Sequence, residues 1–397
     1  MPPLNYPIVQ LKKGKEKSLL QRHPWVFSGA IAHEPSNLAE GAIVQVISAD
    51  KQYLATGHFH KGTITVRCFD FTGEPANTEL FRKKIRQAVA LRQSTALPSV
   101  NTNCYRLLHG EGDGMPGLII DIYFNTAVIQ TYTIGMHQLK EQLVSALRAE
   151  IPQLEAIYDK SMDTMQKHGT HISGDEYLYK SEGYTPPEAV IENGIRYSID
   201  FINGQKTGFF LDQRDNRYLL RQYSNEKKVL NTFCYTGGFS LAALLGGASL
   251  VHSVDSSKKA IEGVEENIKI NAFPGNHQSY AMDVMTFLKQ SEEQYDVIIL
   301  DPPAYAKHLS QTGNAMIGYR NLNTEGIKRI KPGGILFTFS CSQAIDKELF
   351  RKLIFQSALQ AKREVKILHQ LSQPADHPVS IYHPEAEYLK GLVLFVE

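Results

Sequence analysis

A cysteine and an aspartate in this sequence stand where they could act on one substrate. Cys341 lies in TFSCSQ between two serines, and Asp301 begins the phrase DPPAYAK. A thiolate can attack an electrophilic carbon, and a carboxyl group can hold a planar base by hydrogen bonds. Pro302 and Pro303 lack backbone N–H groups and stiffen the chain directly after Asp301. Taken alone, a cysteine at the end of a buried strand is more often a small apolar residue than a nucleophile.

A second group of residues could bind a nucleotide-like ligand. NTFCYTGGFSLAAL joins an apolar run to a helix through a glycine pair, a turn that lets backbone N–H groups approach a ligand. It matches neither GxGxxG nor the GK[ST] of a phosphate loop, so we expect a ligand without a triphosphate. A plain strand-to-helix turn is the alternative. Asp255 ends the next apolar run, where an acid can accept both ribose hydroxyls of an adenosine. Asp283 could contact the adenine, or it could cap a helix.

These residues need a scaffold that brings strand ends together. From about residue 190, apolar runs alternate with helical segments, which predicts a parallel sheet covered by helices on both faces. The expected strands are 227–233, 250–255, 295–301 and 333–340, followed by 363–371 and 389–397. Ligands bind outside the carboxyl ends of strands in such a sheet, so we expect the candidate residues to meet at one edge.

The rest of the chain predicts two further domains. Residues 1–72 read as short strands of a β-barrel-like module. Residues 73–185 mix strands and helices, one helix being expected over 137–150, and form an α+β middle domain. A polar linker with a proline pair then leads to the third domain, residues 186–397.

The composition is that of an ordinary globular protein. The 397 residues include 42 Lys+Arg and 41 Asp+Glu, and 42% are hydrophobic, which excludes disordered, collagen-like and coiled-coil chains. No apolar run reaches the ~18 residues that cross a bilayer, and no signal peptide is recognised. The four cysteines lack CxxC spacing, so neither a disulfide framework nor a metal site is expected. We therefore expect a reduced, cytoplasmic protein.

Several long motifs carry a family resemblance. On NTFCYTGGFS, DPPAYAK and TFSCS, the C-terminal half resembles the class I S-adenosylmethionine (SAM)-dependent methyltransferases. The whole chain is similar to bacterial large-subunit ribosomal RNA (cytosine-C5)-methyltransferases with an N-terminal PUA domain. That similarity extends over RHPWVFSGAI, GEGDGMPGLIIDIY, GQKTGFFLDQRDNR and ADHPV…PEAEYLK. The chain departs from the family after DPP, where Tyr305, Ala306, Lys307 and His308 replace the usual Phe and Ser-Lys pair.

The resemblance implies an α/β fold with three parts and a defined reaction. The fold is a C-terminal Rossmann-like class I methyltransferase domain with an N-terminal β-barrel-like PUA domain and an α+β middle domain. SAM would be the cofactor, ribosomal RNA the partner and 5-methylcytosine the product. Cys341 would attack C6 of the cytosine, and Asp301 would hold N3 and the exocyclic amine. The sequence does not identify the base that removes the C5 proton, and no cysteine follows Asp301 closely.

The implied contacts fall into two groups. The cofactor contacts are Phe233, Tyr235, Thr236, Gly237, Asp255, Asp283 and Gln213. The substrate contacts are Lys206, Pro302, Pro303, Lys307 and Arg22. Two basic clusters, within residues 1–22 and 82–92, fit either RNA phosphates or ordinary solvated faces. Proteins of this architecture resemble dimers, so a homodimer is a further expectation.

Two other functions stay open from the sequence. An aromatic residue after DPP is also typical of amino-methyltransferases that act on adenine or guanine, in which Cys341 would be idle. A non-catalytic RNA-binding protein with a vestigial cofactor fold is the other alternative. The substitution Cys341→Ala separates the two enzymatic hypotheses, because only C5 methylation requires the thiol. Methyl transfer by the purified protein would exclude the binding protein.

Overall fold

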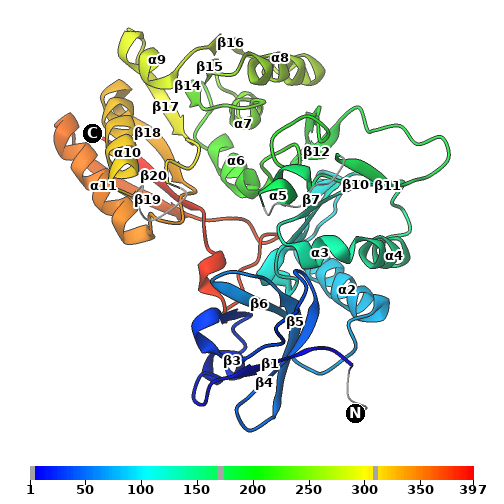
Figure 1. Ribbon diagram of the computed structural model, residues 1–397. Helices are drawn as coiled ribbons and strands as arrows, with labels where there is room; N and C mark the ends of the chain where they lie inside the picture. Colours follow the sequence, from blue (N-terminus) through cyan, green and yellow to red (C-terminus); the bar gives the residue numbers. More distant parts are fainter. Residues whose placement is uncertain (1–4, 168–173, 307–311) are drawn as a thin grey trace. The chain divides into compact units, whose positions relative to one another are not determined.

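The computed structural model describes residues 5–167, 174–306 and 312–397, and the chain forms two compact units (Figure 1). Unit 1 consists of residues 1–190, 199–211 and 375–386, and unit 2 consists of residues 191–198, 212–374 and 387–397. Each unit therefore combines segments that are far apart in the sequence.

The N-terminal part of unit 1 is a six-stranded sheet in the order β2-β6-β5-β4-β1-β3. Its elements are β1 (Ile8–Leu11), α1 (Lys17–Leu20), β2 (Trp25–Phe27), β3 (Ile31–His33), β4 (Ile43–Ile47), β5 (Tyr53–Phe59) and β6 (Ile64–Asp70). Only the β1–β4 pair among these neighbours is parallel. In β4, Val44 and Val46 are fully buried between half-buried neighbours, which is the period-two pattern of a strand with one face in the core.

The middle part of unit 1 is a five-stranded sheet in the order β11-β10-β9-β8-β7. Its strands are β7 (Cys104–His109), β8 (Leu118–Tyr123), β9 (Thr126–Thr131), β10 (Ala156–Asp159) and β11 (Glu176–Lys180). Its helices are α2 (Thr78–Ser94), α3 (Ile134–Gln138), α4 (Lys140–Glu150) and α5 (Met162–Gln166). The single helix expected over 137–150 is wrong. Thr133 caps α3 by accepting the Met136 N–H, so helical structure begins earlier, and Leu139 interrupts it before α4.

Unit 2 is built on a seven-stranded sheet in the order β16-β15-β14-β17-β18-β20-β19. The strands are β14 (Lys228–Thr232), β15 (Leu250–Asp255), β16 (Asn276–Ala281), β17 (Tyr295–Leu300), β18 (Ile330–Ser340), β19 (Val365–Leu371) and β20 (Lys390–Val396). All neighbours are parallel except that β20 lies antiparallel between β18 and β19. The strand order reverses at β14, which makes the carboxyl ends of β14 and β17 the expected ligand crevice.

Helices and a two-stranded ribbon complete this domain. The helices are α6 (Arg214–Arg221), α7 (Gly238–Leu245), α8 (Lys258–Asn271), α9 (Val284–Gln290), α10 (Thr312–Arg329) and α11 (Lys347–Ala361), and the ribbon is β12 (Val190–Glu192) with β13 (Ile195–Tyr197). Leu230, Ile298 and Leu336 are fully buried on neighbouring strands, as expected for a parallel sheet that is covered by helices. The α/β fold predicted from the sequence is confirmed. Among the described helices, none is both long and apolar enough to cross a membrane.

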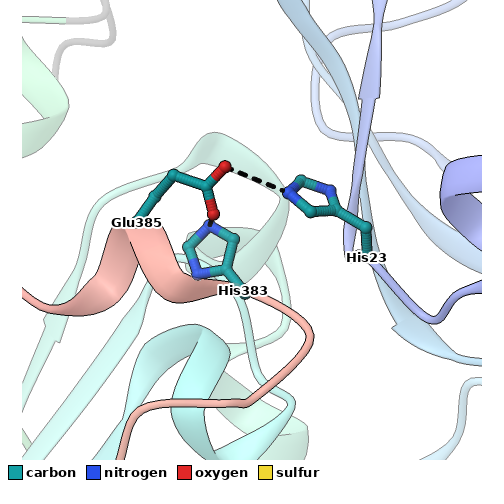
Figure 2. A group of neighbouring side chains, drawn as sticks. All are labelled: His23, His383 and Glu385. Carbon is teal, nitrogen blue, oxygen red and sulfur yellow. Dashed lines mark ion pairs between the residues drawn. The ribbon is translucent and has the colours of Figure 1, made fainter.

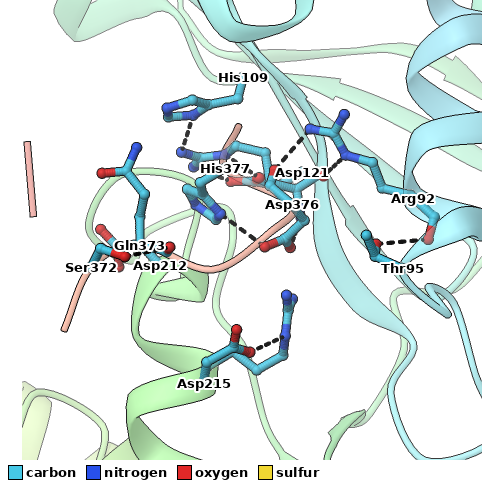
Figure 3. Close-up of polar contacts among 12 residues, drawn as sticks. Arg92, Thr95, His109, Asp121, Asp212, Asp215, Ser372, Gln373, Asp376 and His377 are labelled. Atoms are coloured by element: carbon cyan, nitrogen blue, oxygen red, sulfur yellow. Dashed lines mark hydrogen bonds and ion pairs between the residues drawn. The ribbon is translucent and has the colours of Figure 1, made fainter. Parts of the chain in front are cut away.

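Buried polar contacts connect residues 375–386, the late segment of unit 1, to the middle part of that unit (Figure 3). The Arg92 guanidinium binds the Asp113 carboxylate through two contacts of 2.5 and 2.8 Å, and it also donates to the Asp376 carbonyl at 2.8 Å. The Asp376 carboxylate accepts the Arg106 N–H at 3.0 Å and lies 3.0 Å from His377 Nδ1. The motif ADHPV…PEAEYLK is therefore divided: its first part belongs to unit 1 and its end begins β20 of unit 2.

A second contact of the same segment involves two histidines and a glutamate (Figure 2). His23 Nε2 lies 3.5 Å from Glu385 Oε1, and His383 Nε2 lies 3.8 Å from Glu385 Oε2. The Trp25 N–H donates to His23 Nδ1 at 3.2 Å, so the neutral His23 ring carries its proton on Nε2, facing Glu385. The His383 ring packs edge-on against Trp25, with 4.3 Å between ring centroids. These contacts fix the segment to the N-terminal sheet of unit 1.

Candidate active site

The loop after β14 holds three residues with left-handed backbone. Phe233, Tyr235 and Gly237 have φ values of 52°, 47° and 85°. Phenylalanine and tyrosine adopt this conformation at a cost of roughly 1–2 kcal/mol each, and such strain is typical of ligand-binding loops. A Cβ on Gly237 would lie 3.2 Å from side-chain atoms of both Leu241 and Val264, so only glycine fits without displacement. The loop ends at the N-terminus of α7, where backbone N–H groups are available to a ligand.

Asp255, at the end of β15, fixes this loop with its carboxylate. One oxygen accepts the Tyr235 N–H at 3.0 Å, and the other accepts the Ser257 N–H at 2.9 Å. Each carboxylate oxygen has a further lone pair, and Asp255 is only half-buried, so it can also accept ribose hydroxyls. The neighbouring Thr236 carbonyl accepts the Asn267 side-chain amide at 2.9 Å. These residues therefore form a cradle suited to an adenosine.

Asp283 occupies the start of α9. Its Oδ1 accepts the Thr286 N–H at 2.8 Å and the Thr286 hydroxyl at 2.9 Å. The helix cap that the sequence offered as an alternative is therefore formed. A contact of Asp283 with the cofactor stays a prediction.

Asp301 follows β17 and is held by a glutamine. Gln213 Nε2 donates to Asp301 Oδ2 at 3.0 Å, while Gln213 Oε1 accepts the Asn216 side-chain amide at 2.6 Å. Burial, aided by the charge of Asp212, raises the pKa of Asp301 to about 7, although the Gln213 hydrogen bond and the Arg217 charge act in the opposite direction. At neutral pH, Asp301 is therefore divided between its protonated and ionised forms.

Cys341 follows β18 and is partly exposed, whereas Cys68, Cys104 and Cys234 are buried. Burial raises the pKa of the Cys341 thiol to about 11, and the charges of Asp301 and Asp212 act in the same direction. The charge of Lys390 lowers that pKa. The nucleophile candidate and Asp301 thus belong to one electrostatic cluster, as predicted from their positions at two neighbouring strand ends.

A hydrogen bond joins the chain after Asp301 to the chain after Cys341, and α10 supports it. Ser342 Oγ accepts the Ala306 N–H at 3.3 Å and lies 2.9 Å from the Tyr319 hydroxyl. The rings of Tyr305 and Tyr319 pack with 4.7 Å between centroids. Two loops from adjacent strands are therefore held together, which positions the carboxyl group relative to the thiol.

The predicted substrate contacts are distributed over both units. Pro302 is buried and Pro303 is exposed in the loop of unit 2. Arg22 and Lys206 are exposed residues of unit 1 with φ values of 64° and 53°. Lys307 lies outside the described residues.

The second basic cluster has acidic partners that the local sequence does not show. Arg82 and Arg86 on α2 both bind Glu150 at the end of α4, with shortest contacts of 3.1 and 2.8 Å. Lys83 contacts Glu74 at 2.5 Å. These ion pairs reduce the positive charge that this face could offer to RNA phosphates.

Lys390, Tyr388 and Asp212 were quoted in motifs but not assigned a role from the sequence. Lys390 Nζ donates to the Ser342 carbonyl at 2.8 Å. The Tyr388 hydroxyl donates to Asp212 Oδ2 at 2.6 Å, and Asp212 Oδ1 is buried without a hydrogen-bond partner among the described residues. These residues lie in PEAEYLK and FLDQR, but nothing in the local sequence indicates that these segments lie close to TFSCS.

The strand order and the cradle after β14 define the class of this protein. Residues 106–394 match the S-adenosylmethionine-dependent methyltransferase family, and residues 9–71 match the PUA-like domain. A structure described as a SAM-dependent methyltransferase from Streptococcus mutans has a TM-score of 0.83 and 26% identity, covering 98% of this chain and 99% of that one. A second methyltransferase structure with the same score is complexed with S-adenosylhomocysteine. The chain is a SAM-dependent methyltransferase with a PUA-like domain.

Curated relatives narrow this class. Ribosomal RNA large subunit methyltransferase I of Enterobacter sp. (strain 638) is 38% identical over 390 residues, which cover 96% of this chain and 97% of the relative. The protein of that name from Photobacterium profundum is 39% identical over 404 residues, with 98% and 99% coverage. The chain belongs to the ribosomal RNA large subunit methyltransferase I family. The family resemblance and the SAM cofactor predicted from the sequence are confirmed.

Proposed function

We propose that this protein transfers a methyl group from SAM to C5 of a cytosine in large-subunit ribosomal RNA. The names of its relatives support ribosomal RNA as the substrate. The choice of cytosine C5 rests on one observation, the partly exposed Cys341 in the same charged cluster as Asp301. An amino-methyltransferase would need the carboxyl group but not the thiol.

The proposed reaction begins with covalent attack by the protein. C5 of cytosine is a poor nucleophile, and a bond from Cys341 Sγ to C6 makes C5 enamine-like. When bound, SAM supplies the electrophilic methyl group. Loss of the C5 proton to a base then restores the C5–C6 double bond and releases Sγ as the thiolate.

The protonated form of Asp301 offers hydrogen-bonding groups that complement cytosine. Because Gln213 donates to Asp301 Oδ2, that oxygen is an acceptor and the acid proton is best placed on Oδ1. An O–H group can donate to N3 of cytosine, and the carbonyl oxygen can accept from the exocyclic amine. The donor at N3 withdraws electrons from the ring and favours attack at C6. The raised pKa of Asp301 keeps a large fraction of this form at neutral pH.

Unit 1 is proposed to bind the RNA. Its PUA-like domain, the N-terminal lysines, Arg22 and Lys206 would contact phosphates and RNA shape rather than sequence. C5 and C6 are inaccessible in a stacked helix, so the target base must be flipped out or unpaired. We therefore propose a loop cytosine, or one in incompletely assembled ribosomal RNA. We also propose a cytoplasmic homodimer, and light scattering on the purified protein tests the dimer.

The experiment is methyl transfer to ribosomal RNA followed by mass spectrometry of the nucleosides. The wild-type protein is expected to yield 5-methylcytidine, and Cys341→Ala is expected to lose this activity. Cys104→Ala, which removes a thiol from the buried strand β7, is the matched control and should retain it. A methylated exocyclic amine, formed equally by Cys341→Ala, would replace the proposal by the amino-methyltransferase. Transfer by neither protein to any form of the RNA would favour a binding role.

A further inference from the structure

The proposed reaction requires Cys341 to ionise, but the charges of Asp301 and Asp212 disfavour its ionisation. With a pKa of about 11, only about one Cys341 thiol in several thousand is ionised at pH 7.5. The carboxylates of Asp301 and Asp212 increase the free energy of forming a further anion beside them. A neighbouring cation would offset that repulsion.

Lys390 is placed beside the thiol by the antiparallel pairing of β18 with β20. Its backbone is the register partner of Ser340, directly before Cys341. Its Nζ donates to the carbonyl of Ser342, directly after Cys341. The backbone of Lys390 therefore lies beside the residue before Cys341, and its ammonium group contacts the residue after it. It is only 5% exposed, so solvent screens its charge little.

The charges around both groups agree with this placement. The thiol is acted on by Asp301, Asp212 and Lys390, and only the last of these favours ionisation. Lys390 is acted on by Cys341, Asp346, Glu387 and Lys347. Of these four groups, Cys341 has the largest electrostatic effect on the lysine, and Lys347 alone disfavours its charge.

We propose that Lys390 is a positioning residue whose ammonium group pairs with the Cys341 thiolate and favours its formation. The S–H bond breaks and the proton leaves to solvent, while Nζ keeps its three hydrogens. One of them stays bonded to the Ser342 carbonyl, and a second is then available to the sulfur. The inference rests on the proposed function, because it assumes that Cys341 is the nucleophile.

The same environment limits the pH range of this effect. Burial lowers the pKa of Lys390 to about 8. Below that pH the ammonium is present and favours the thiolate; above it the lysine loses its charge and the effect weakens. The thiolate in turn favours the ammonium, because the coupling between the two groups is reciprocal.

The test is the rate of alkylation of Cys341 by iodoacetamide, measured from pH 6.5 to 11 by peptide mass spectrometry without RNA or SAM. Lys390→Gln keeps an N–H donor for the Ser342 carbonyl but removes the charge. We expect alkylation about tenfold slower at pH 7.5, which corresponds to a pKa increase of about one unit, and a difference that shrinks above about pH 8 as Lys390 of the wild type loses its charge. The control is Lys366→Met. Lys366 is an exposed lysine of β19 that contacts Glu397, directly after the last residue of β20, and this variant should be alkylated at the wild-type rate.

Three results would overturn the inference. These are a Lys390→Gln profile that superimposes on the wild type, faster alkylation of Lys390→Gln at pH 7.5, and a rate reduced by the same factor at every pH, which would indicate a structural role. If Lys390→Gln does not fold, Lys390→Arg decides. Arginine keeps its proton at pH 9, so this variant should be alkylated at least as fast as the wild type there, and slower alkylation would refute the pairing. Because no methyl transfer is measured, the outcome is independent of whether the C5 reaction itself is confirmed.

Discussion

Replacement of Asp301 by asparagine should stabilise the folded protein at pH 8 while removing a proposed catalytic group. Asparagine keeps the size of aspartate and can still accept the hydrogen bond from Gln213 Nε2. It carries no charge, so it avoids the ionisation that burial and Asp212 disfavour. Functional groups held in an unfavourable state commonly show this opposition between activity and stability.

The expected magnitude follows from the raised pKa. In the unfolded chain Asp301 ionises near its ordinary value of 3.8, whereas in the folded protein it ionises near 7. The wild type therefore loses stability as the pH rises from the first value through the second. Between pH 5 and the folded-state pKa of about 7, the wild type loses stability over about two pH units. At about 1.4 kcal/mol per unit, the loss is about 3 kcal/mol. Because residue Asp301 is partly exposed, screening reduces this to about 2 kcal/mol, or about 4–8 °C in Tm.

The assay is differential scanning calorimetry of the wild type and Asp301→Asn at both pH values. Asp296, at the other end of β17, is the matched control. Although burial acts to raise its pKa, hydrogen bonds from the Lys228 N–H and from Lys331 bring it below its ordinary value. Asp296→Asn should therefore destabilise the protein at pH 8. A raised pKa of Asp301 is refuted if the Tm difference between Asp301→Asn and the wild type does not increase by several degrees from pH 5 to pH 8.

Three further substitutions test the cofactor loop, a buried ion pair and the contact beside the thiol. Gly237→Ala should weaken SAM binding about tenfold in calorimetric titration, because the left-handed backbone costs alanine about 1–2 kcal/mol; unchanged affinity would contradict the cradle. Arg92→Met should lower the free energy of unfolding by about 3–5 kcal/mol in denaturant titration, since the Asp113 carboxylate would stay buried without its cation; a loss below about 1 kcal/mol would count against this. Tyr319→Phe removes the hydroxyl at Ser342 Oγ and should reduce kcat several-fold while leaving the KM for SAM unchanged, and an unaltered kcat would show that this contact does not position the thiol.

The positions of the main site residues could be predicted from local sequence. Asp255 ends one apolar run and Asp301 follows another, both typical of buried strands, and the carboxyl ends of parallel strands share one edge. Cys341 follows a third run of this kind. A local pattern was enough because each residue is placed by the strand that immediately precedes it.

Residues brought in from distant segments could not be predicted in this way. Lys390 lies beside the Cys341 turn only because β20 is inserted antiparallel between β18 and β19, which its own sequence does not reveal. Glu150 neutralises Arg86 from 64 positions away. The edge strand β16, NHQSYA, is polar and partly exposed, so hydrophobic periodicity gives it no clear signal.

The central claim is a covalent bond between Cys341 and C6 of the target cytosine, and RNA containing 5-fluorocytidine tests it most directly. Fluorine at C5 leaves no proton for the base to remove, so the adduct cannot resolve after methyl transfer. The covalent mechanism predicts an RNA–protein band that withstands denaturation, requires SAM and is absent with Cys341→Ala. Methylation of unmodified RNA without any such band on the fluorinated RNA would contradict the covalent mechanism.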